Sequence, residues 1–159
     1  MHLVCLGVVK KLIGYWLRGQ LTTRVSAVQV KSWSKTIVSF VPFTCTEFGR
    51  VPRSFKEIDR WKAVEFRSFL IYFGPLLLRS ELPDKLYHHF MLLNVAITIL
   101  SCLVLCKAML SYASVLLRQF VTEAGILYGE GSLVYNMHNL VHLCDDATEF
   151  GVLDQFSCF

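Results

Sequence analysis

Charged residues are scarce in this sequence of 159 residues, because Asp, Glu, Lys and Arg make up 18% of it against 54% hydrophobic residues. A disordered tail would need the opposite balance, so that class is excluded. Four Pro and nine Gly are too few for a collagen-like or low-complexity chain. The length suits one domain, and the excess of apolar residues predicts either a membrane span or surfaces that normally face missing protein.

Sequence motifs that identify common enzyme classes are also missing. The chain contains no internal repeat and no GxGxxG, Walker loop, zinc-finger spacing or GxSxG. Its six cysteines follow no disulfide framework, which favours buried reduced thiols in a protein that is not secreted. A signal peptide is not predicted, because Lys10 and Lys11 follow the first apolar stretch instead of preceding it.

The charges that are present are unevenly distributed. Residues 1–80 hold 13 Lys and Arg against 4 Asp and Glu, whereas residues 81–159 hold 3 against 8. A basic segment of this kind suits phosphate or an acidic partner, and a merely solvated helical surface would look the same. We therefore expect a basic half, 1–80, and an acidic and apolar half, 81–159, within one region.

Apolar spacings of three and four predict a mainly α-helical fold, an irregular multi-helix bundle. Residues 3–17 fit one helix, and residues 133–149 fit the last one. Between Gly19 and Phe48 we expect one or two short helices, although the alternation of Val28 and Val30 also allows a strand. The acidic half contains a charge-free run from Phe90 to Cys106, which is borderline in length for a membrane span.

A polar stripe runs through that apolar segment. Asn94, Thr98 and Ser101 follow one another at spacings of four and three. This pattern favours a core helix, or two helices with a break near residues 101–107, over a helix that faces lipid.

The clearest local signal begins at Ser54. Ser54 is a good N-cap and Glu57 would complete a capping box, while Gly74 and Pro75 end or kink the helix about twenty residues later. On such a helix one face carries Ile58, Trp61, Glu65, Phe69 and Tyr72.

Glu65 therefore lies where burial is expected. A buried carboxylate is costly unless it is paired, protonated or bound to a metal, which makes Glu65 a candidate functional residue. The structural alternative is a salt bridge to Lys62, Arg67 or another basic side chain.

His138 and His142 are four residues apart and share a helix face in the last predicted helix. Such a pair binds zinc if further ligands converge, but HNLVH lacks the Glu of the HExxH motif. A hydrogen-bonded pair within a helical core is the more common arrangement.

Three blocks carry a resemblance to a known family: MHLVCLGVVKKLI, TEFGRVPRSFKEIDRWKAVEFRSFLIYFGP and LVYNMHNLVHLCDDATEFGVLDQFSCF. Together they resemble transposases of the CACTA or EnSpm-like superfamily, in particular its animal branch. The resemblance covers nearly the whole chain and is weakest over residues 91–115. It implies the C-terminal part of an RNase H-like catalytic core and the helical region that follows.

The resemblance implies cut-and-paste DNA transposition, in which three acidic residues hold two Mg²⁺ or Mn²⁺ ions that activate the attacking oxygen. Met1 and His2 match the family's Met-His dipeptide, which follows the second acid, so the first two acids are expected before residue 1. Glu65, in WKAVEF, matches the third acid and would bind metal only with those upstream acids. We therefore expect a partial domain that neither needs a metal nor cleaves DNA by itself.

The basic residues expected to contact DNA phosphates weakly and without sequence preference are Lys10, Lys11, Arg50, Arg53, Arg60 and Lys62. The expected location is the nucleus, and the expected partners are DNA, the missing N-terminal half or other transposase copies. A non-catalytic DNA-binding or protein-interacting remnant is one alternative. A small membrane protein with one span near residues 90–117 is the other.

Overall fold

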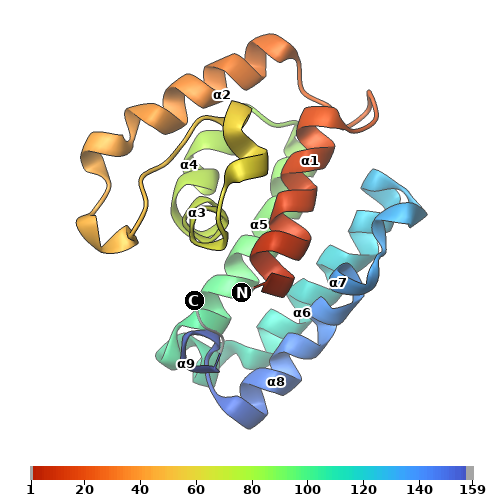
Figure 1. Ribbon diagram of the computed structural model, residues 1–159. Helices are drawn as coiled ribbons and strands as arrows, with labels where there is room; N and C mark the ends of the chain where they lie inside the picture. The colour runs from red at the N-terminus through yellow and green to blue at the C-terminus, as the bar shows by residue number, and fades with distance from the viewer. Residues whose placement is uncertain (1, 157–159) are drawn as a thin grey trace. The chain divides into compact units, whose positions relative to one another are not determined.

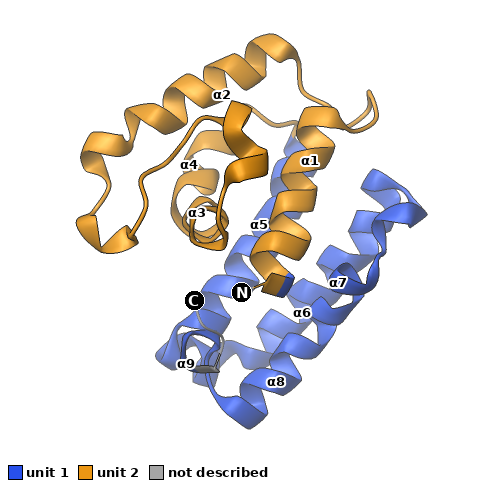
Figure 2. Ribbon diagram, in the orientation of Figure 1, with its two compact units in different colours: residues 1, 3, 84–159 blue, residues 2, 4–83 orange. Residues whose placement is uncertain are grey.

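The computed structural model describes residues 2–156, and over that range it contains helices and no β-strand (Figure 1). This confirms the predicted mainly α-helical fold. The described chain divides into two compact units (Figure 2). Residues 2 and 4–83 form unit 2, and residue 3 with the described residues from 84 onward forms unit 1. The change from basic to acidic composition, at residue 81, lies close to this boundary.

Unit 2 is built from short helical segments. In chain order they are η1 (His2–Val9), α1 (Lys10–Arg18), α2 (Ala27–Ser39), η2 (Val41–Phe43), η3 (Thr46–Phe48), η4 (Phe55–Arg60), α3 (Ala63–Ser68), η5 (Phe69–Phe73) and α4 (Gly74–Leu78). The helix predicted over residues 3–17 is present as η1 and α1. Helix α2 begins after Ser26, whose Oγ accepts a hydrogen bond from the Gln29 N–H at 3.2 Å. The strand alternative at Val28 and Val30 is therefore wrong.

Aromatic side chains form the core of unit 2. Trp16 of α1 packs against Trp33 of α2, with ring centroids 6.5 Å apart, and Trp33 packs against Phe55 of η4 at 5.8 Å. Phe55 in turn contacts Trp61 at 5.3 Å and Phe69 of η5 at 5.7 Å. All five residues are buried. Edge-to-face contacts between large rings therefore connect four helical segments of this unit.

The predicted twenty-residue helix from Ser54 is wrong in detail. A 3₁₀ helix, η4, ends at Arg60, and α3 starts at Ala63 after two extended residues. Ser54 Oγ accepts from the Lys56 N–H at 3.2 Å, and the Glu57 side chain lies 3.4 Å from Arg53 Nη1, so the expected capping box does not form. The helix is interrupted at Trp61 because the Trp61 ring lies in the aromatic core. There the Trp61 Nε1 donates to the Ser54 carbonyl at 3.3 Å.

Unit 1 contains two long helices followed by short ones. They are α5 (Asp84–Ser101), α6 (Leu103–Tyr128), η6 (Glu130–Ser132), α7 (Tyr135–His138), η7 (Asn139–His142), α8 (Leu143–Phe150) and α9 (Leu153–Phe156). The last three segments before α9 run on without a gap, so the helix predicted over residues 133–149 is present in three parts. Gly129 has a φ of 85°, which favours glycine at the turn after α6.

Helices α5 and α6 form an antiparallel hairpin. His89, near the start of α5, contacts Phe120 and Tyr128, toward the end of α6. The helices are separated by Cys102, which has extended φ and ψ angles of −110° and 121°. The predicted break near residues 101–107 is confirmed. The charge-free run from Phe90 to Cys106 is consequently divided between two helices and cannot cross a membrane as one.

Among the described residues, helix α6 is long and apolar enough to cross a membrane, and 28% of its most apolar 18-residue stretch is buried. Its exposed apolar residues include Val104, Val115 and Ile126. A membrane span at α6 would be displaced toward the C-terminus from the run that the sequence suggested.

Five cysteines lie in the described part of the chain, and all five are free thiols. Cys5, Cys106 and Cys144 are buried, whereas Cys45 is exposed. Burial raises the pKa of Cys5 and of Cys144 to about 11, so both thiols are protonated at neutral pH. Cys158 lies outside the described residues.

Candidate functional site

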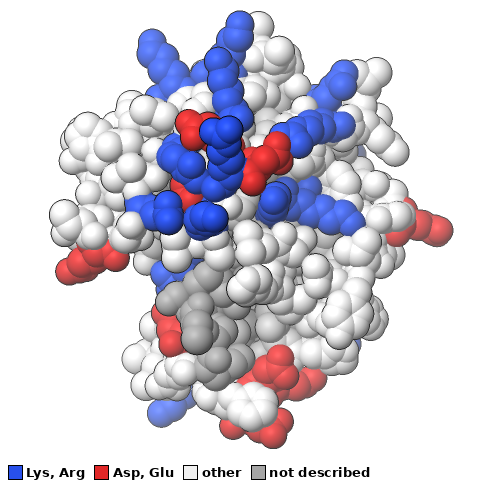
Figure 3. All heavy atoms as spheres, viewed as in Figure 1, with Lys and Arg blue, Asp and Glu red and all other residues white. Residues whose placement is uncertain are grey.

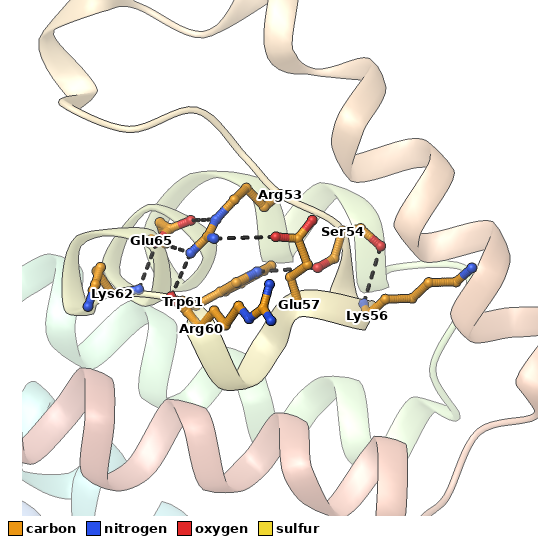
Figure 4. Close-up of polar contacts among 8 residues, drawn as sticks. All are labelled: Arg53, Ser54, Lys56, Glu57, Arg60, Trp61, Lys62 and Glu65. Carbon is orange, nitrogen blue, oxygen red and sulfur yellow. Dashed lines mark hydrogen bonds and ion pairs between the residues drawn. The ribbon is translucent and has the colours of Figure 1, made fainter.

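Glu65 is buried, as the apolar stripe predicted, and its partner is Arg53 (Figure 4). Arg53 Nε donates to Glu65 Oε1 at 2.6 Å, and Arg53 Nη2 donates to Oε2 at 2.9 Å. The same Nη2 donates to the carbonyl oxygen of Arg60 at 2.7 Å. The Glu65 side chain is 3% exposed and that of Arg53 is 28% exposed. The pair is a two-point salt bridge held at the edge of the aromatic core.

Glu65 also starts helix α3. Its Oε2 accepts the backbone N–H of Lys62 at 2.7 Å, which satisfies a free donor at the helix N-terminus. Both carboxylate oxygens are thus engaged by protein donors. The hydrogen bond from Arg53 to Glu65 raises the pKa of the Arg53 guanidinium.

The metal chemistry implied by the family resemblance does not fit this arrangement. A two-metal site needs several carboxylates with free lone pairs, whereas both Glu65 oxygens accept hydrogen bonds and Arg53 lies between Glu65 and Glu57. Among residues 2–156 no cluster of three or more His, Cys, Asp or Glu side chains could hold a metal ion.

The predicted DNA-contacting residues all belong to unit 2, but they differ in exposure and in ion pairing. Arg50, Arg60 and Lys62 are exposed, and their side chains form no ion pair within the described residues. Lys10 and Lys11 are half-buried on α1, and Lys11 Nζ lies 5.7 Å from the centre of the Tyr15 ring. His2 is exposed in η1. Within residues 2–156, Arg53 is the one of these six that pairs with carboxylates, those of Glu57 and Glu65.

A second ion pair lies on the exposed side of η4. Arg18 Nη2 of α1 donates to Asp59 Oδ2 at 2.6 Å, and both side chains are more than 60% exposed. The hydrogen bond from Arg18 lowers the pKa of Asp59, and the charge of Lys10 acts in the same direction. Lys10 and Arg18 therefore present their positive charges on the same side of α1 as Asp59.

Lysine and arginine side chains gather on the unit 2 part of the face shown in Figure 3. Unit 2 contains thirteen Lys and Arg against five Asp and Glu. Three of those five acids, Glu57, Asp59 and Glu65, are held in ion pairs with Arg18 or Arg53. Most of the cationic side chains therefore retain an uncompensated charge.

His138 and His142 lie close together on the surface of unit 1, with ring centroids 6.0 Å apart. Both side chains are exposed, so the expected hydrogen-bonded pair within a core is wrong. His142 Nδ1 lies 3.8 Å from Asp145 Oδ2. Within residues 2–156 this pair belongs to no group of three or more His, Cys, Asp or Glu side chains that could hold a metal ion.

His89 is a buried polar residue that sequence analysis missed. Its side chain is fully buried, its Nε2 lies 2.9 Å from the Phe120 carbonyl oxygen, and its ring stacks on Phe120 at 4.2 Å. The Tyr128 hydroxyl lies 3.5 Å from Nδ1. Burial lowers the pKa of His89, so the imidazole is neutral at neutral pH. Its position between Leu86 and Leu93, at spacings of three and four, was the available signal.

The site thus combines an exposed basic surface with a carboxylate that the protein itself neutralises. Such a surface can bind a polyanion through its phosphates. The Glu65 carboxylate is placed to hold Arg53 and to start α3. No family model, no curated protein and no solved structure matches this chain.

Proposed function

We propose that this chain is a non-catalytic, DNA-binding derivative of a CACTA or EnSpm-like transposase. The observation that carries the DNA-binding part is the excess of exposed, unpaired Lys and Arg side chains on unit 2 (Figure 3). Cations on a surface bind the phosphate backbone without reading sequence, so the expected binding is non-specific and weakens with salt. The transposase origin is supported by the three sequence blocks, and a nuclear location follows from it.

The non-catalytic part of the proposal is supported by the surroundings of Glu65. In the resemblance Glu65 matches a metal-binding acid, yet its two oxygens accept three hydrogen bonds, two from Arg53 and one from the Lys62 N–H. A divalent ion at Glu65 would have to displace a buried, two-point arginine contact. The proposed role of Glu65 is therefore structural, and the chain neither cleaves nor joins DNA by itself. Mg²⁺ or Mn²⁺ would belong only to a parent enzyme.

The proposal is tested by titrating the purified chain into a fluorescent DNA duplex at several salt concentrations. We expect log K to fall linearly with log salt, with a slope of roughly −4 to −5 if about four to six phosphates are contacted. The same samples, incubated with Mg²⁺ or Mn²⁺, are expected to leave the DNA uncut. Arg60→Gln with Lys62→Gln removes two exposed charges and should reduce the steepness of that slope by about 2.

The matched control is Lys85→Gln with Lys107→Gln, which removes two exposed charges from unit 1. Its slope should stay close to that of the unaltered chain. Equal effects of the two double variants would contradict a DNA-binding surface on unit 2. DNA cleavage that disappears in Glu65→Gln would contradict the structural role of Glu65.

A small membrane protein is the second candidate, and helix α6 is the observation that favours it. Its length and apolar composition are sufficient to cross a bilayer, and most of its apolar window is not buried. Against it, α6 carries the charged residues Lys107, Arg118 and Glu123, which are costly within a bilayer. We therefore rank DNA binding first.

A further inference from the structure

A second basic site in unit 2 uses none of the residues assigned to DNA contacts. It is a hollow of about 480 Å³ whose polar lining comes from Arg24, Ser26, Lys31 and Lys56. Its remaining lining is apolar and includes Leu17 and Val30. No carboxylate lines it. Three cations therefore line one hollow, and no acidic side chain among the described residues lines it with them.

Packing brings Lys56 together with Arg24 and Lys31, which lie more than twenty residues earlier in the sequence. The contact between the Trp33 and Phe55 rings holds α2 against η4. Lys31 lies two residues before Trp33 on α2, and Lys56 directly follows Phe55 on η4, so the same contact brings the two lysines close. Arg24 lies in the connection before α2. That connection is fixed by the Arg24 N–H on the Gln20 carbonyl at 2.8 Å and by the Val25 N–H on the Trp16 carbonyl at 2.9 Å. The segments that line the hollow are therefore fixed by the packing and backbone hydrogen bonds of unit 2.

The nearest acidic residues are turned to other partners. Glu57, next to Lys56 in sequence, contacts Arg53, and Lys56 extends away from that group (Figure 4). Glu81 accepts a hydrogen bond from Trp33 Nε1 at 3.1 Å. None of Arg24, Lys31 and Lys56 forms an ion pair within the described residues. Their charges remain available to a ligand.

We propose that this hollow binds a phosphate monoester, with Arg24, Lys31 and Lys56 around the phosphate and the apolar lining against the attached group. A monoester carries up to two negative charges at neutral pH, compared with one for a backbone diester, and so gains more from three converging cations. The hollow also has room for more than a phosphate. The shared chemistry fits a free nucleotide and the terminal phosphate of a nucleic-acid strand.

The test is a calorimetric titration of the whole chain with adenosine monophosphate, adenosine and inorganic phosphate at constant ionic strength. We expect adenosine monophosphate to bind most tightly, inorganic phosphate more weakly and adenosine not at all. Lys31→Gln with Lys56→Gln should weaken binding of adenosine monophosphate by about tenfold or more. The control is Arg60→Gln with Lys62→Gln, which removes the same charge outside the hollow and should change binding less than about twofold.

Two results would overturn the site: no binding of either phosphate compound, or equal weakening in the two double variants. The second result would mean attraction by overall charge. The DNA titration and the adenosine monophosphate titration can fail independently, because they use different ligands. The variant of Arg60 and Lys62 is the test variant for DNA binding and the control variant for binding of adenosine monophosphate.

The source of the phosphate is separated by a second arm. Short single strands with a 5′-phosphate and with a 5′-hydroxyl are compared. Tighter binding of the phosphorylated strand, lost in the Lys31 and Lys56 variant, supports the site with a strand end as its ligand. Equal binding of the two strands, together with binding of adenosine monophosphate, supports the site with a free nucleotide as its ligand.

Discussion

Glu65 shows how far a single residue can be understood from local pattern. Its place on an apolar stripe predicted burial, and the side chain is buried. The stripe did not identify its partner, because Arg53 is twelve residues away and reaches Glu65 only after the chain turns at Trp61. Lys62, one of the partners considered, contributes its backbone N–H in place of its ammonium group.

We predict that Arg53→Ala destabilises unit 2 by about 2 kcal/mol, because it leaves a buried carboxylate with one hydrogen-bond donor. Chemical denaturation followed by tryptophan fluorescence measures the change, since Trp16, Trp33 and Trp61 lie in that unit. The comparison is Arg18→Ala, which removes the exposed pair with Asp59 and should leave the denaturation midpoint unchanged. If both substitutions have the same effect, the Arg53 contact is not specific to the buried carboxylate.

At the scale of elements, the hairpin of α5 and α6 depends on the helix break at Cys102 and on the buried imidazole of His89. The break was predicted from the polar stripe, and it occurs at Cys102. The position of His89 between the two helices was not predicted, because periodicity identifies a buried face but not what faces it. The contacts of its ring with Phe120 and Tyr128 cross between helices.

This imidazole makes the stability of unit 1 depend on pH. Burial lowers the pKa of His89 from its ordinary value of 6.5, while the Phe120 carbonyl and the charge of Glu123 act in the opposite direction. The unfolded chain binds a proton on His89 more readily than the folded chain does. The free energy of unfolding should therefore fall as the pH decreases from about 6.5, until the pH reaches the folded-state pKa of His89.

Denaturation midpoints between pH 8 and pH 5 measure this effect. His89→Gln should be less stable at pH 8 and should lose less stability on acidification than the unaltered chain. His142→Gln, which removes an exposed imidazole, should leave the pH dependence as it was. A pH dependence that persists in His89→Gln would assign the effect to other groups.

At the scale of the whole molecule, the net charge of +4 conceals two units of opposite charge. Unit 2 is basic and unit 1 is acidic, and the boundary between them is close to the change in composition. The apolar excess is found partly in the aromatic core of unit 2 and partly on the exposed residues of α6. The exposed apolar residues of α6 are the reason to test the membrane alternative by experiment.

We predict that alkaline carbonate extraction of cells that express the chain recovers it in the soluble fraction. The charged residues of α6 oppose a span by that helix, and the break at Cys102 interrupts the apolar run near residues 90–117. A resident membrane protein in the same extract serves as the control for the pellet. Recovery of the chain in the pellet would favour the membrane function over DNA binding.

The sequence by itself determined the helical class, the basic and acidic halves, the break between α5 and α6 and the burial of Glu65. These features follow from periodicity and composition, which act over a few residues. Only the tertiary structure decided the partner of Glu65, the interruption at Trp61 and the meeting of Arg24, Lys31 and Lys56. Those features depend on contacts between segments far apart in the chain, such as Trp33 with Phe55, which local patterns do not encode.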